Sequence, residues 1–412
     1  MSLVAPADIR LPRVDSLEKW AVIACDQFTS QPEYWQRVRE HVGDAPSALR
    51  LVLPEAELGV DDDARAAAIN AEMARLLSSG RFDEYQGAMV YVERTLMNGQ
   101  VRKGLVGAVD LEAYDYAPGS VSPIRASEKN VVERIPPRKK IRQNAPLELP
   151  HVLLLCDDDE RVLIEPLTAI RDSLPKLYDF DLMEGGGHIA GWLVQGEALA
   201  AFEARLDAYA RTVDKKYEGL NGASVLFAVG DGNHSLATAK ACYEDQKRGM
   251  STEEALMLPS RWALVELENI HDEAQAFEPI HRLVLTEVPE ALLERMKKEL
   301  GAETGYPIRW MAGEKSGTIY LDERRGPLAV GVLQAFLDQY MAEHHCDIDF
   351  IHGEEALRQL AARDGAVGLM LPAIDKGGLF RGIVADGVLP RKSFSMGHAQ
   401  EKRYYLEARK IR

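Results

Sequence analysis

VLFAVGDGNHSLATAKA, residues 225–241, is the stretch of the sequence that decides the fold. Its first part, 225–229, is apolar enough for a strand that is buried on both faces of a sheet. The glycine turn Gly230-Asp231-Gly232 follows, and Asn233-His234-Ser235 lead into a pattern typical of a helix. The stretch therefore predicts a central strand, a tight turn and a helix in direct succession.

The polar residues of this turn suit the binding of an anion. Glycine permits a tight turn and a close approach of the backbone to a ligand, and the N–H groups and dipole of a helix N-terminus favour negative charge. A carboxylate, an amide, an imidazole and a hydroxyl come together here, which suits phosphate binding, metal ligation or proton transfer. The candidate residues of the turn are Gly230, Asp231, Gly232, Asn233, His234 and Ser235. The alternative is structural, with Asp231 or Asn233 as a helix cap.

On both sides of this stretch the chain shows alternating helical and strand patterns. Strand patterns cover 21–24, 88–96, 101–111, 151–157, 187–194, 223–229, 261–270, 316–321, 347–351 and 366–371. Helical patterns cover 63–79, 196–216, 234–248, 288–300, 329–342 and 353–363. Residues 117–150 show little periodicity and are interpreted as extended strand and loop. The sequence predicts an α+β (mixed α/β) fold with a sheet-centred core.

The pattern changes near residue 286, and this change predicts a domain boundary. The main domain, 1–286, would hold the GDGNHS turn. The smaller mixed unit, 287–412, would end in a basic segment that returns to the site.

Two basic segments stand out in an acidic protein. Residues 125–142 hold seven basic and two acidic side chains, and residues 391–412 hold the same numbers. The first includes Arg125, Glu128 and Arg138, and its arginines can clamp a phosphate. In the second, Lys392 stands beside a turn and could close over a phosphate. The alternative for both is a solvated surface charge.

Two further segments carry polar residues next to strand patterns. In 21–35, Asp26 follows the apolar run at the end of a strand, a frequent position for site residues, whereas Cys25 is interpreted as a buried small residue. In 180–192, three glycines and His188 form a loop that suits either a ligand or a simple hairpin turn.

The composition excludes several classes of protein. The 412 residues include 65 acidic and 49 basic side chains, a net charge of -16, whereas coating nucleic acid or an anionic membrane requires a broad basic surface. The four cysteines form no CxxC pair, so a thiolate zinc site is not expected. No run approaches the roughly 18–20 apolar residues that span a bilayer. The N-terminus does not match a signal peptide, and we expect a cytoplasmic protein.

Six segments together resemble one family. They are WAVIACDQFTSQPEYW, IRASEKNVVERIPPRKKIRQNAPLELPH, DFDLMEGGGHI, VGDGNHSLATAK, EPIHR and LPRKSFSMGHAQEKRYY. They extend from the first strand to the C-terminus. On this basis the chain is identified as a member of the bacterial and archaeal family called domain of unknown function 1015, whose name assigns no activity.

The DGNHS turn also resembles, more remotely, the Asp-Gly-His-(His/Thr)-Arg turn of the ParB and sulfiredoxin-like superfamily. That group includes an ADP-dependent kinase of free serine, nucleotide-hydrolysing partition proteins and sulfiredoxin, and its turn binds nucleotide or phosphate at a helix N-terminus. Asp231, Gly232 and His234 match the turn, whereas Asn233 replaces a histidine and Ser235 stands where an arginine is common. The missing cation would then come from elsewhere, and the candidates are Arg125 and Lys392.

The first functional hypothesis is a nucleotide-dependent small-molecule kinase or phosphotransferase that uses Mg²⁺ with ATP or ADP. The catalytic candidates are Asp231, His234 and Glu128, with Asp231 also the metal ligand and Glu128 the base. The candidates for phosphate or nucleotide binding are Gly230, Gly232, Asn233, Ser235, Arg125, Arg138 and Lys392.

Two alternatives stay open. One is a nucleotide- or phosphate-binding regulatory protein without efficient turnover, which the missing arginine favours. The other is a metal-dependent hydrolase that uses Asp231, His234 and His188. The expected partner is a small phosphorylated ligand or a nucleotide and neither nucleic acid nor a membrane, and the sequence leaves a homodimer open.

Overall fold

The computed structural model of the protein describes residues 3–29, 31–59, 61–129, 135–219, 223–374, 376–390 and 392–412. The chain divides into two compact units, each with its own sheet. Unit 1 comprises Met1–Glu218, Ala223–Gln275 and His398–Arg412, and unit 2 comprises Gly219–Gly222 and Ala276–Gly397. The division falls before the predicted boundary at residue 286, because the strand Phe277–Thr286 pairs within the sheet of unit 2. The last residues of the chain belong to unit 1.

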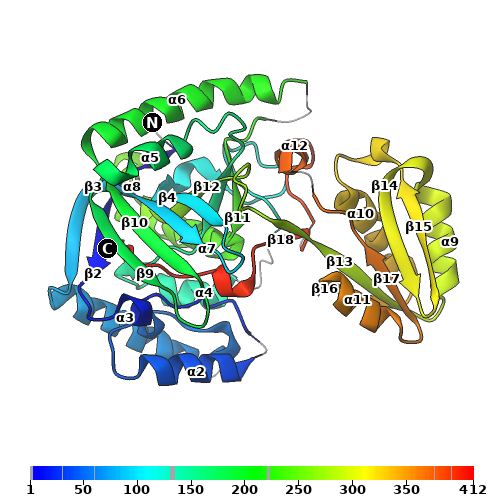
Figure 1. The fold of residues 1–412 in the computed structure, drawn as a ribbon, viewed down its shortest axis with the longest axis horizontal. Coiled ribbons are helices and arrows are strands. Elements are labelled where there is room, and N and C mark those ends of the chain that lie inside the picture. The colour runs from blue at the N-terminus through cyan, green and yellow to red at the C-terminus, as the bar shows by residue number, and fades with distance from the viewer. Residues whose placement is uncertain are drawn as a thin grey trace. The chain divides into compact units, whose positions relative to one another are not determined.

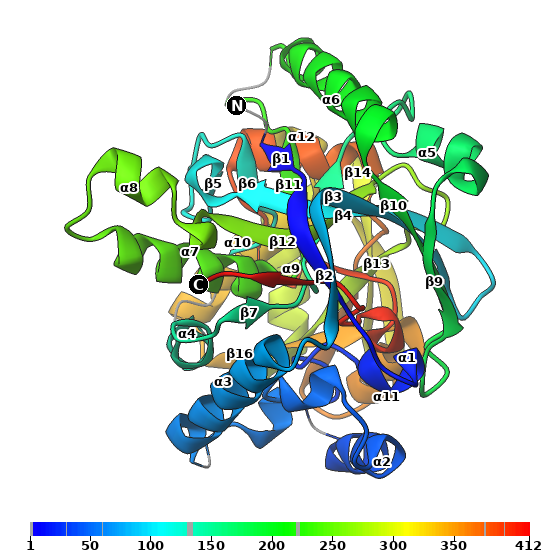
Figure 2. The ribbon, with the colours of Figure 1, turned by 90° about the vertical axis from the view of Figure 1, so that its left-hand side faces the viewer.

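Unit 1 is built on a sheet of 13 strands (Figures 1 and 2). The strands are β1 (Val4–Ala5), β2 (Ala7–Pro12), β3 (Phe82–Thr95), β4 (Val101–Asp110), β5 (Tyr114–Asp115), β6 (Ile124–Ala126), β7 (Leu147–Glu148), β8 (Leu153–Cys156), β9 (Lys176–Asp181), β10 (His188–Val194), β11 (Phe227–Asp231), β12 (Trp262–Asn269) and β19 (Ala408–Lys410). The main path through the sheet runs β5-β6-β11-β8-β12-β4-β3-β2-β19-β7. The strand β11 is an inner strand, parallel to β6 and antiparallel to β8.

Helices join these strands. They are α1 (Leu17–Trp20), α2 (Pro32–Val42), α3 (Asp62–Ser78), α4 (Ile135–Arg142), α5 (Glu165–Ile170), α6 (Gly196–Lys216), α7 (Asn233–Lys247) and α8 (Thr252–Leu256). The helix α4 shows that the prediction of only strand and loop for 117–150 was wrong. Two prolines near the start of α4 are compatible with a helix, since the first turn does not use their missing N–H groups. The predicted strand at 21–24 was also wrong: among the described residues this run forms one isolated bridge, Ile23 to Arg403.

The carboxy-terminal segment completes the sheet of unit 1. The strand β19 lies between β2 and β7 and pairs antiparallel with both (Figure 2). Just before it, Tyr404 donates its backbone N–H to Val22 O at 2.9 Å, and Ala24 donates to Lys402 O at 2.8 Å. Residues 402–404 therefore run beside residues 22–24, far away in the sequence.

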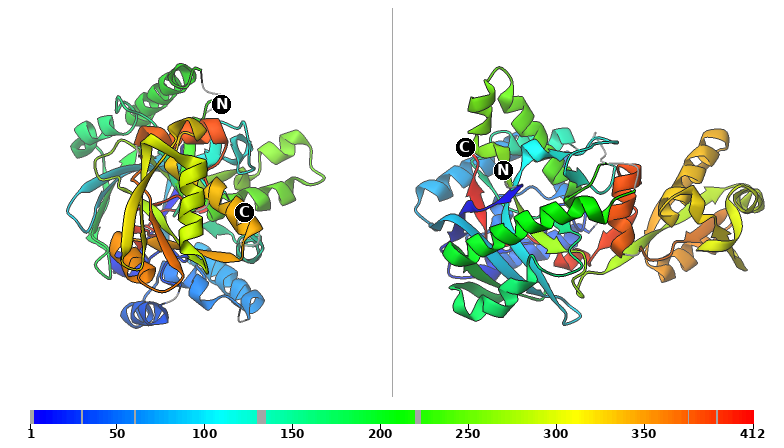
Figure 3. Two further views of the ribbon diagram at one scale, coloured as in Figure 1. Left: turned by 90° about the vertical axis from the view of Figure 1, so that its right-hand side faces the viewer. Right: turned by 90° about the horizontal axis from the view of Figure 1, so that it is seen from above.

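Unit 2 has a six-stranded sheet with the main path β15-β14-β17-β13-β16. Its strands are β13 (Phe277–Thr286), β14 (Gly301–Ala312), β15 (Lys315–Leu321), β16 (Cys346–His352), β17 (Ala366–Met370) and β18 (Phe394–Met396). Its helices are α9 (Pro289–Leu300), α10 (Ala329–Glu343), α11 (Glu354–Ala361) and α12 (Lys376–Asp386). The helix α9 packs on the β14–β15 hairpin (Figure 3).

Both units combine sheets with packed helices, and the predicted α+β fold is confirmed. The core of unit 1 is a large apolar cluster around Trp20, Trp35 and the inner faces of β2 and β3. In the part of the chain that the structure describes, no helix is long and apolar enough to cross a membrane.

Candidate functional site

The glycine turn connects β11 to α7, as the sequence predicts. The strand ends at Asp231, and α7 begins at Asn233. Gly232 has φ of +79°, in the left-handed region that favours glycine. A Cβ atom at Gly232 would lie 3.0 Å from the Cα of Val152 on the neighbouring segment. Glycine is therefore required here both by the backbone conformation and by the close approach of the next segment.

The N-terminus of α7 has no side-chain cap. Gly232 occupies the N-cap position, and the first turn contains no acidic residue. The backbone N–H groups of Ser235 and Leu236 both donate to Gly232 O, at 2.9 and 3.0 Å. The structural alternative, in which Asp231 or Asn233 caps the helix, does not match this geometry. The positive potential of the helix N-terminus can therefore attract an anionic group other than a capping side chain.

Lys402 lies beside this turn. Its Nζ is 3.3 Å from Asp231 Oδ1, and the two side chains are 15% and 20% exposed. Burial lowers the pKa of Lys402, but the carboxylates of Asp231 and Asp26, with a smaller effect of Glu128, outweigh burial and raise the pKa overall. The cation is therefore held charged among three carboxylates.

His151 and Ser235 form a second polar pair at the same turn. The His151 Nε2 is 2.7 Å from Ser235 Oγ. Burial lowers the pKa of His151, although Asp26 and Asp231 act in the opposite direction. A neutral imidazole at this distance can accept the hydroxyl proton. The pair arises because His151 precedes β8, which runs antiparallel to β11.

Asp26 joins the same group of charges from the amino-terminal segment. Burial raises its pKa, but His151, Lys402 and Arg138 together with a hydrogen bond from Gln27 outweigh burial, and the pKa is lowered overall. Asp26 therefore stays ionised near the turn. It is placed there by the pairing of residues 22–24 with 402–404.

Two cavities meet at His151. A cavity of about 10 Å³ is lined by Asp231, Lys402, Arg102, Glu266 and His151, among others. A larger pocket of about 150 Å³ also has His151 on its wall, together with Ser235 and mainly apolar side chains. We call the larger one the apolar pocket.

Among the predicted turn residues, Asn233 and His234 stay near Asp231 at the start of α7. Asn233 Nδ2 is 3.4 Å from Ser127 Oγ, and its Oδ1 is buried without a hydrogen-bond partner. The backbone carbonyl of His234 accepts from Thr238 Oγ1 at 2.7 Å. Glu128 acts electrostatically on Lys402.

The predicted basic residues are placed differently. Arg125 is 2% exposed and donates to the backbone carbonyls of Ser122, Ala223 and Ser224, so it fixes neighbouring segments. Arg138, on α4, pairs with Glu55 on the wall of the apolar pocket.

Three other sets of predicted residues are not among the residues around this turn or lie outside the described chain. Lys392 belongs to unit 2, where its carbonyl accepts from Arg282 at 2.9 Å. His188 is partly exposed on β10, with its ring nitrogens 2.7 and 2.8 Å from the carboxylates of Asp181 and Asp179. Arg134 and Arg391, which belong to the two basic segments, lie outside the described residues.

Sequence reasoning missed Lys402 and His151. Lys402 was inside the basic segment 391–412, but nothing in its spacing distinguished it from Lys392. His151 is the last residue of the segment IRASEKNVVERIPPRKKIRQNAPLELPH, and its position at the start of the predicted strand 151–157 was the available signal. Within the described residues, no group of three or more His, Cys, Asp or Glu side chains is arranged to hold a metal ion.

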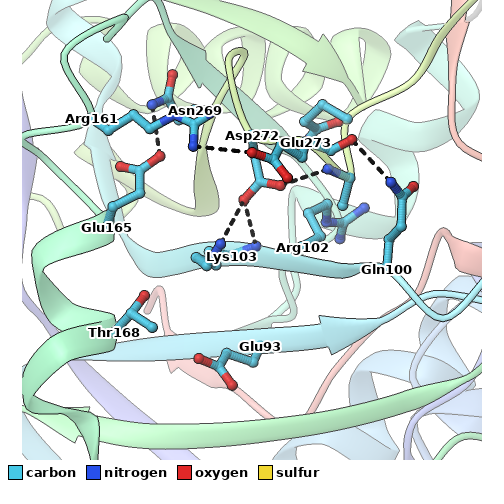
Figure 4. A network of polar contacts seen from close by, with 12 residues as sticks. Glu93, Gln100, Arg102, Lys103, Arg161, Glu165, Thr168, Asn269, Asp272 and Glu273 are labelled. Carbon is cyan, nitrogen blue, oxygen red and sulfur yellow. Dashed lines mark hydrogen bonds and ion pairs between the residues drawn. The ribbon is translucent and has the colours of Figure 1, made fainter.

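Figure 4 shows another polar network in unit 1, on β4 and after β12. Asp272 accepts from the backbone N–H groups of Lys103 and Ala274, at 3.2 and 2.8 Å. Asn269 Nδ2 donates to Glu165 Oε1 at 2.8 Å. These groups bond to one another and to the backbone, and we assign them to holding the loop after β12 against β4.

The fold and the turn define an α+β protein with a polar site at a strand–glycine–helix junction. A family model described as "Protein of unknown function (DUF1015)" matches residues 5–410. The chain belongs to this family. No curated protein matches the chain.

The chain is also similar, at low sequence identity, to several solved structures. The free serine kinase in complex with AMP is 12% identical, with 71% of this chain and 92% of that chain covered and a TM-score of 0.36. SbnI with a C-terminal truncation, from Staphylococcus aureus, is 11% identical, with 71% and 82% covered and a TM-score of 0.36. A conserved hypothetical protein from Pyrococcus furiosus is 12% identical, with 69% and 90% covered and a TM-score of 0.33.

Proposed function

We propose that this protein is a nucleotide-dependent phosphotransferase that acts on a small molecule. The observation that carries the proposal is the position of Lys402, 3.3 Å from Asp231, at an α7 N-terminus that has no side-chain cap. Phosphoryl transfer requires cationic groups on the phosphates, a carboxylate for the metal and a group that takes the acceptor proton. Each of these is present around this turn.

The nucleotide phosphates would bind at the start of α7. A helix N-terminus attracts anions through its dipole and its backbone N–H groups. Gly232 carries no side chain that could obstruct such a ligand. Lys402 supplies the positive charge that Ser235 cannot supply, and it replaces Arg125 and Lys392 in the hypothesis from sequence.

Mg²⁺ fits the donor set. Magnesium prefers oxygen ligands and is usually bound by one or two carboxylates together with phosphate oxygens and water. Asp231 and Asp26, which both act on Lys402 and His151, offer two carboxylates. We therefore propose that the metal arrives with the nucleotide and neutralises charge on its phosphates.

The His151–Ser235 pair would take the acceptor proton. Its imidazole has a lowered pKa and is 2.7 Å from the Ser235 hydroxyl. We assign the role of base to His151 in place of Glu128, whose carboxylate contributes negative charge near Lys402.

Calorimetric titration with Mg·ATP and Mg·ADP tests the proposal. We expect binding by the protein, and a loss of at least about tenfold in affinity for Lys402→Met, because a hydrogen bond to a charged group contributes about 1.5–3 kcal/mol. Lys240→Met is the matched control: Lys240 is 16% exposed, against 15% for Lys402, and pairs with Glu244 on α7 itself. We expect its affinity to stay within about twofold of the original value.

The outcomes separate the hypotheses. No binding of either nucleotide, or an equal loss in both lysine variants, would reject the proposal. Binding without turnover over a panel of alcohols and amines, with neither ADP formed from ATP nor AMP formed from ADP, would favour the regulatory alternative, in which Ser235 in place of an arginine leaves the helix without a catalytic cation.

A further inference from the structure

The apolar pocket shares wall residues with the proposed transfer site. His151 is on the walls of both the apolar pocket and the small cavity that contains Asp231 and Lys402. Ser235 is on the wall of the apolar pocket too. A molecule in this pocket would therefore meet His151 and Ser235, and His151 also lines the cavity of Asp231 and Lys402.

The other side chains on the wall of the apolar pocket indicate what kind of ligand it can bind. Most of its side chains are apolar, and examples are Leu51, Leu53, Met73, Leu149 and Leu264.

The charged side chains on the wall are paired within the protein. Arg138 pairs with Glu55, and Arg142 pairs with Glu148. A charged ligand would lose its hydration in this pocket without gaining an opposite charge that is free to pair with it. Binding of a charged ligand is therefore disfavoured.

The size of the pocket limits the occupant further. Its volume is about 150 Å³. An engineered apolar cavity of about 150 Å³ in another protein binds benzene. Adenine has a fused bicyclic ring that is larger than benzene, and its hydrogen-bonding nitrogen atoms would be left unpaired against an apolar wall. The pocket therefore suits a body smaller and less polar than a nucleoside.

We infer that the apolar pocket holds the phosphoryl acceptor, and that this acceptor is a primary alcohol with an uncharged, apolar body about the size of benzene. This inference rests on the proposed function for its chemical step. The alcohol oxygen attacks the terminal phosphorus of ATP, the bond from that phosphorus to the bridging oxygen breaks, and ADP leaves. The alcohol proton passes to His151 Nε2, and the phosphate monoester is the product.

Binding to the nucleotide-free protein is the first test. Benzyl alcohol and 3-methylbutan-1-ol serve as probes, with L-serine and glycerol as polar comparators, in ligand-observed NMR titrations. We expect both alcohols to bind, and Leu149→Phe to weaken their binding at least about tenfold by filling the pocket. Val52→Phe, also on the wall, provides a second variant in case the first does not fold.

Leu177→Phe is the matched control. Leu177 is partly buried against the same apolar core but is on strand β9 and not on the wall of the pocket. We expect its alcohol affinity to match that of the unmodified protein. Equal binding in the control and in folded wall variants would overturn the inference, and so would displacement of the alcohols by adenosine.

Turnover is the second test, with Mg·ATP and each probe, followed by detection of the phosphate ester by mass spectrometry. We expect benzyl phosphate to form faster than phosphoserine, and His151→Gln to lower kcat more than tenfold with little change in the KM for the alcohol. Preference for serine would overturn the inference. Alcohol binding that is lost in the wall variants, with no nucleotide binding at all, would reject the phosphotransferase and keep the apolar ligand.

Discussion

Gly232 is the residue on which the geometry of the turn depends. Its φ of +79° is costly for a residue with a Cβ, by about 1–2 kcal/mol. The space around it is also restricted, since an added Cβ would be 3.0 Å from the Cα of Val152. Both constraints act at the position where the phosphates are proposed to bind.

Gly232→Ala is expected to lower the free energy of unfolding by about 1–3 kcal/mol, because strain and a backbone contact add to each other. Urea unfolding followed by circular dichroism measures this change. Gly80→Ala is the control, because Gly80 has φ of +65° but nothing within 4 Å of an added Cβ. An equal loss in both variants would show that the contact with Val152 has no separate effect.

Glu407 is expected to make the stability of the protein depend on pH. It is fully buried and accepts a hydrogen bond from Tyr178 at 2.5 Å. Burial raises its pKa to about 7 from the ordinary value of 4.5. Since the folded state binds this proton more tightly than the unfolded state, the contribution to stability is present below pH 4.5 and is lost as the pH rises through 7.

Glu407→Gln is expected to make stability less dependent on pH. Between pH 5 and pH 8 the unmodified protein should lose about 2–3 kcal/mol through this carboxyl, and the amide should lose none of it. Denaturant unfolding at pH 5, 6, 7 and 8 measures the two slopes. Glu268, whose pKa is also raised by burial, is present in both proteins and cancels in the comparison. Identical slopes would contradict the assignment to Glu407.

At the scale of elements, the carboxy-terminal segment is an integral part of the sheet and not a solvated basic tail. Its strand β19 is an inner strand between β2 and β7, and Tyr404, Tyr405 and Leu406 just before it are buried. The segment thus supplies both part of the core and Lys402. The basic side chains of this segment are conspicuous in the sequence, but its apolar side chains are the ones that contribute to the core.

Removal of residues 398–412 is expected to abolish cooperative unfolding, because it opens the sheet and uncovers the core of unit 1. Near-ultraviolet circular dichroism and thermal unfolding measure this loss. Lys410→Ala is the control, since it removes an exposed charge and keeps the strand; its stability should change by less than about 0.5 kcal/mol. A truncated protein with a native near-ultraviolet spectrum would contradict the expectation.

Elements with a strong local period could be predicted from the sequence, and those that depend on distant partners could not. The helix 196–216 and the strand and helix on either side of Gly232 were predicted, because their periodicity and glycine signal are local. The helix α4 is not evident from the sequence, because its two prolines suggest an extended chain, although Pro is tolerated in the first turn of a helix. The run 21–24 looks like a strand but has only one bridge.

At the scale of the whole molecule, the proposed site is assembled from four distant parts of the chain. Asp26, His151 and Lys402 come from different segments, and they meet Asp231 through the pairing of 22–24 with 402–404 and of β8 with β11. The sequence could indicate the turn at Asp231, since its residues are adjacent. It could not select Lys402 over Lys392, because that choice depends on which residues enter unit 1.

The two units have separate sheets and separate apolar cores, so a ligand of unit 1 should stabilise the units unequally. At a hundredfold excess over its Kd, Mg·ATP would stabilise the unit that binds it by about 2.7 kcal/mol. Amide hydrogen exchange of Phe227–Asp231 should then slow by about a hundredfold, whereas Ala366–Met370 in unit 2 should be unchanged. Mass spectrometry of peptides from both strands measures the difference, with Lys402→Met as the control that should lose the protection. Equal protection of both strands would mean that the two units open together, and protection of β17 alone would move the nucleotide site out of unit 1.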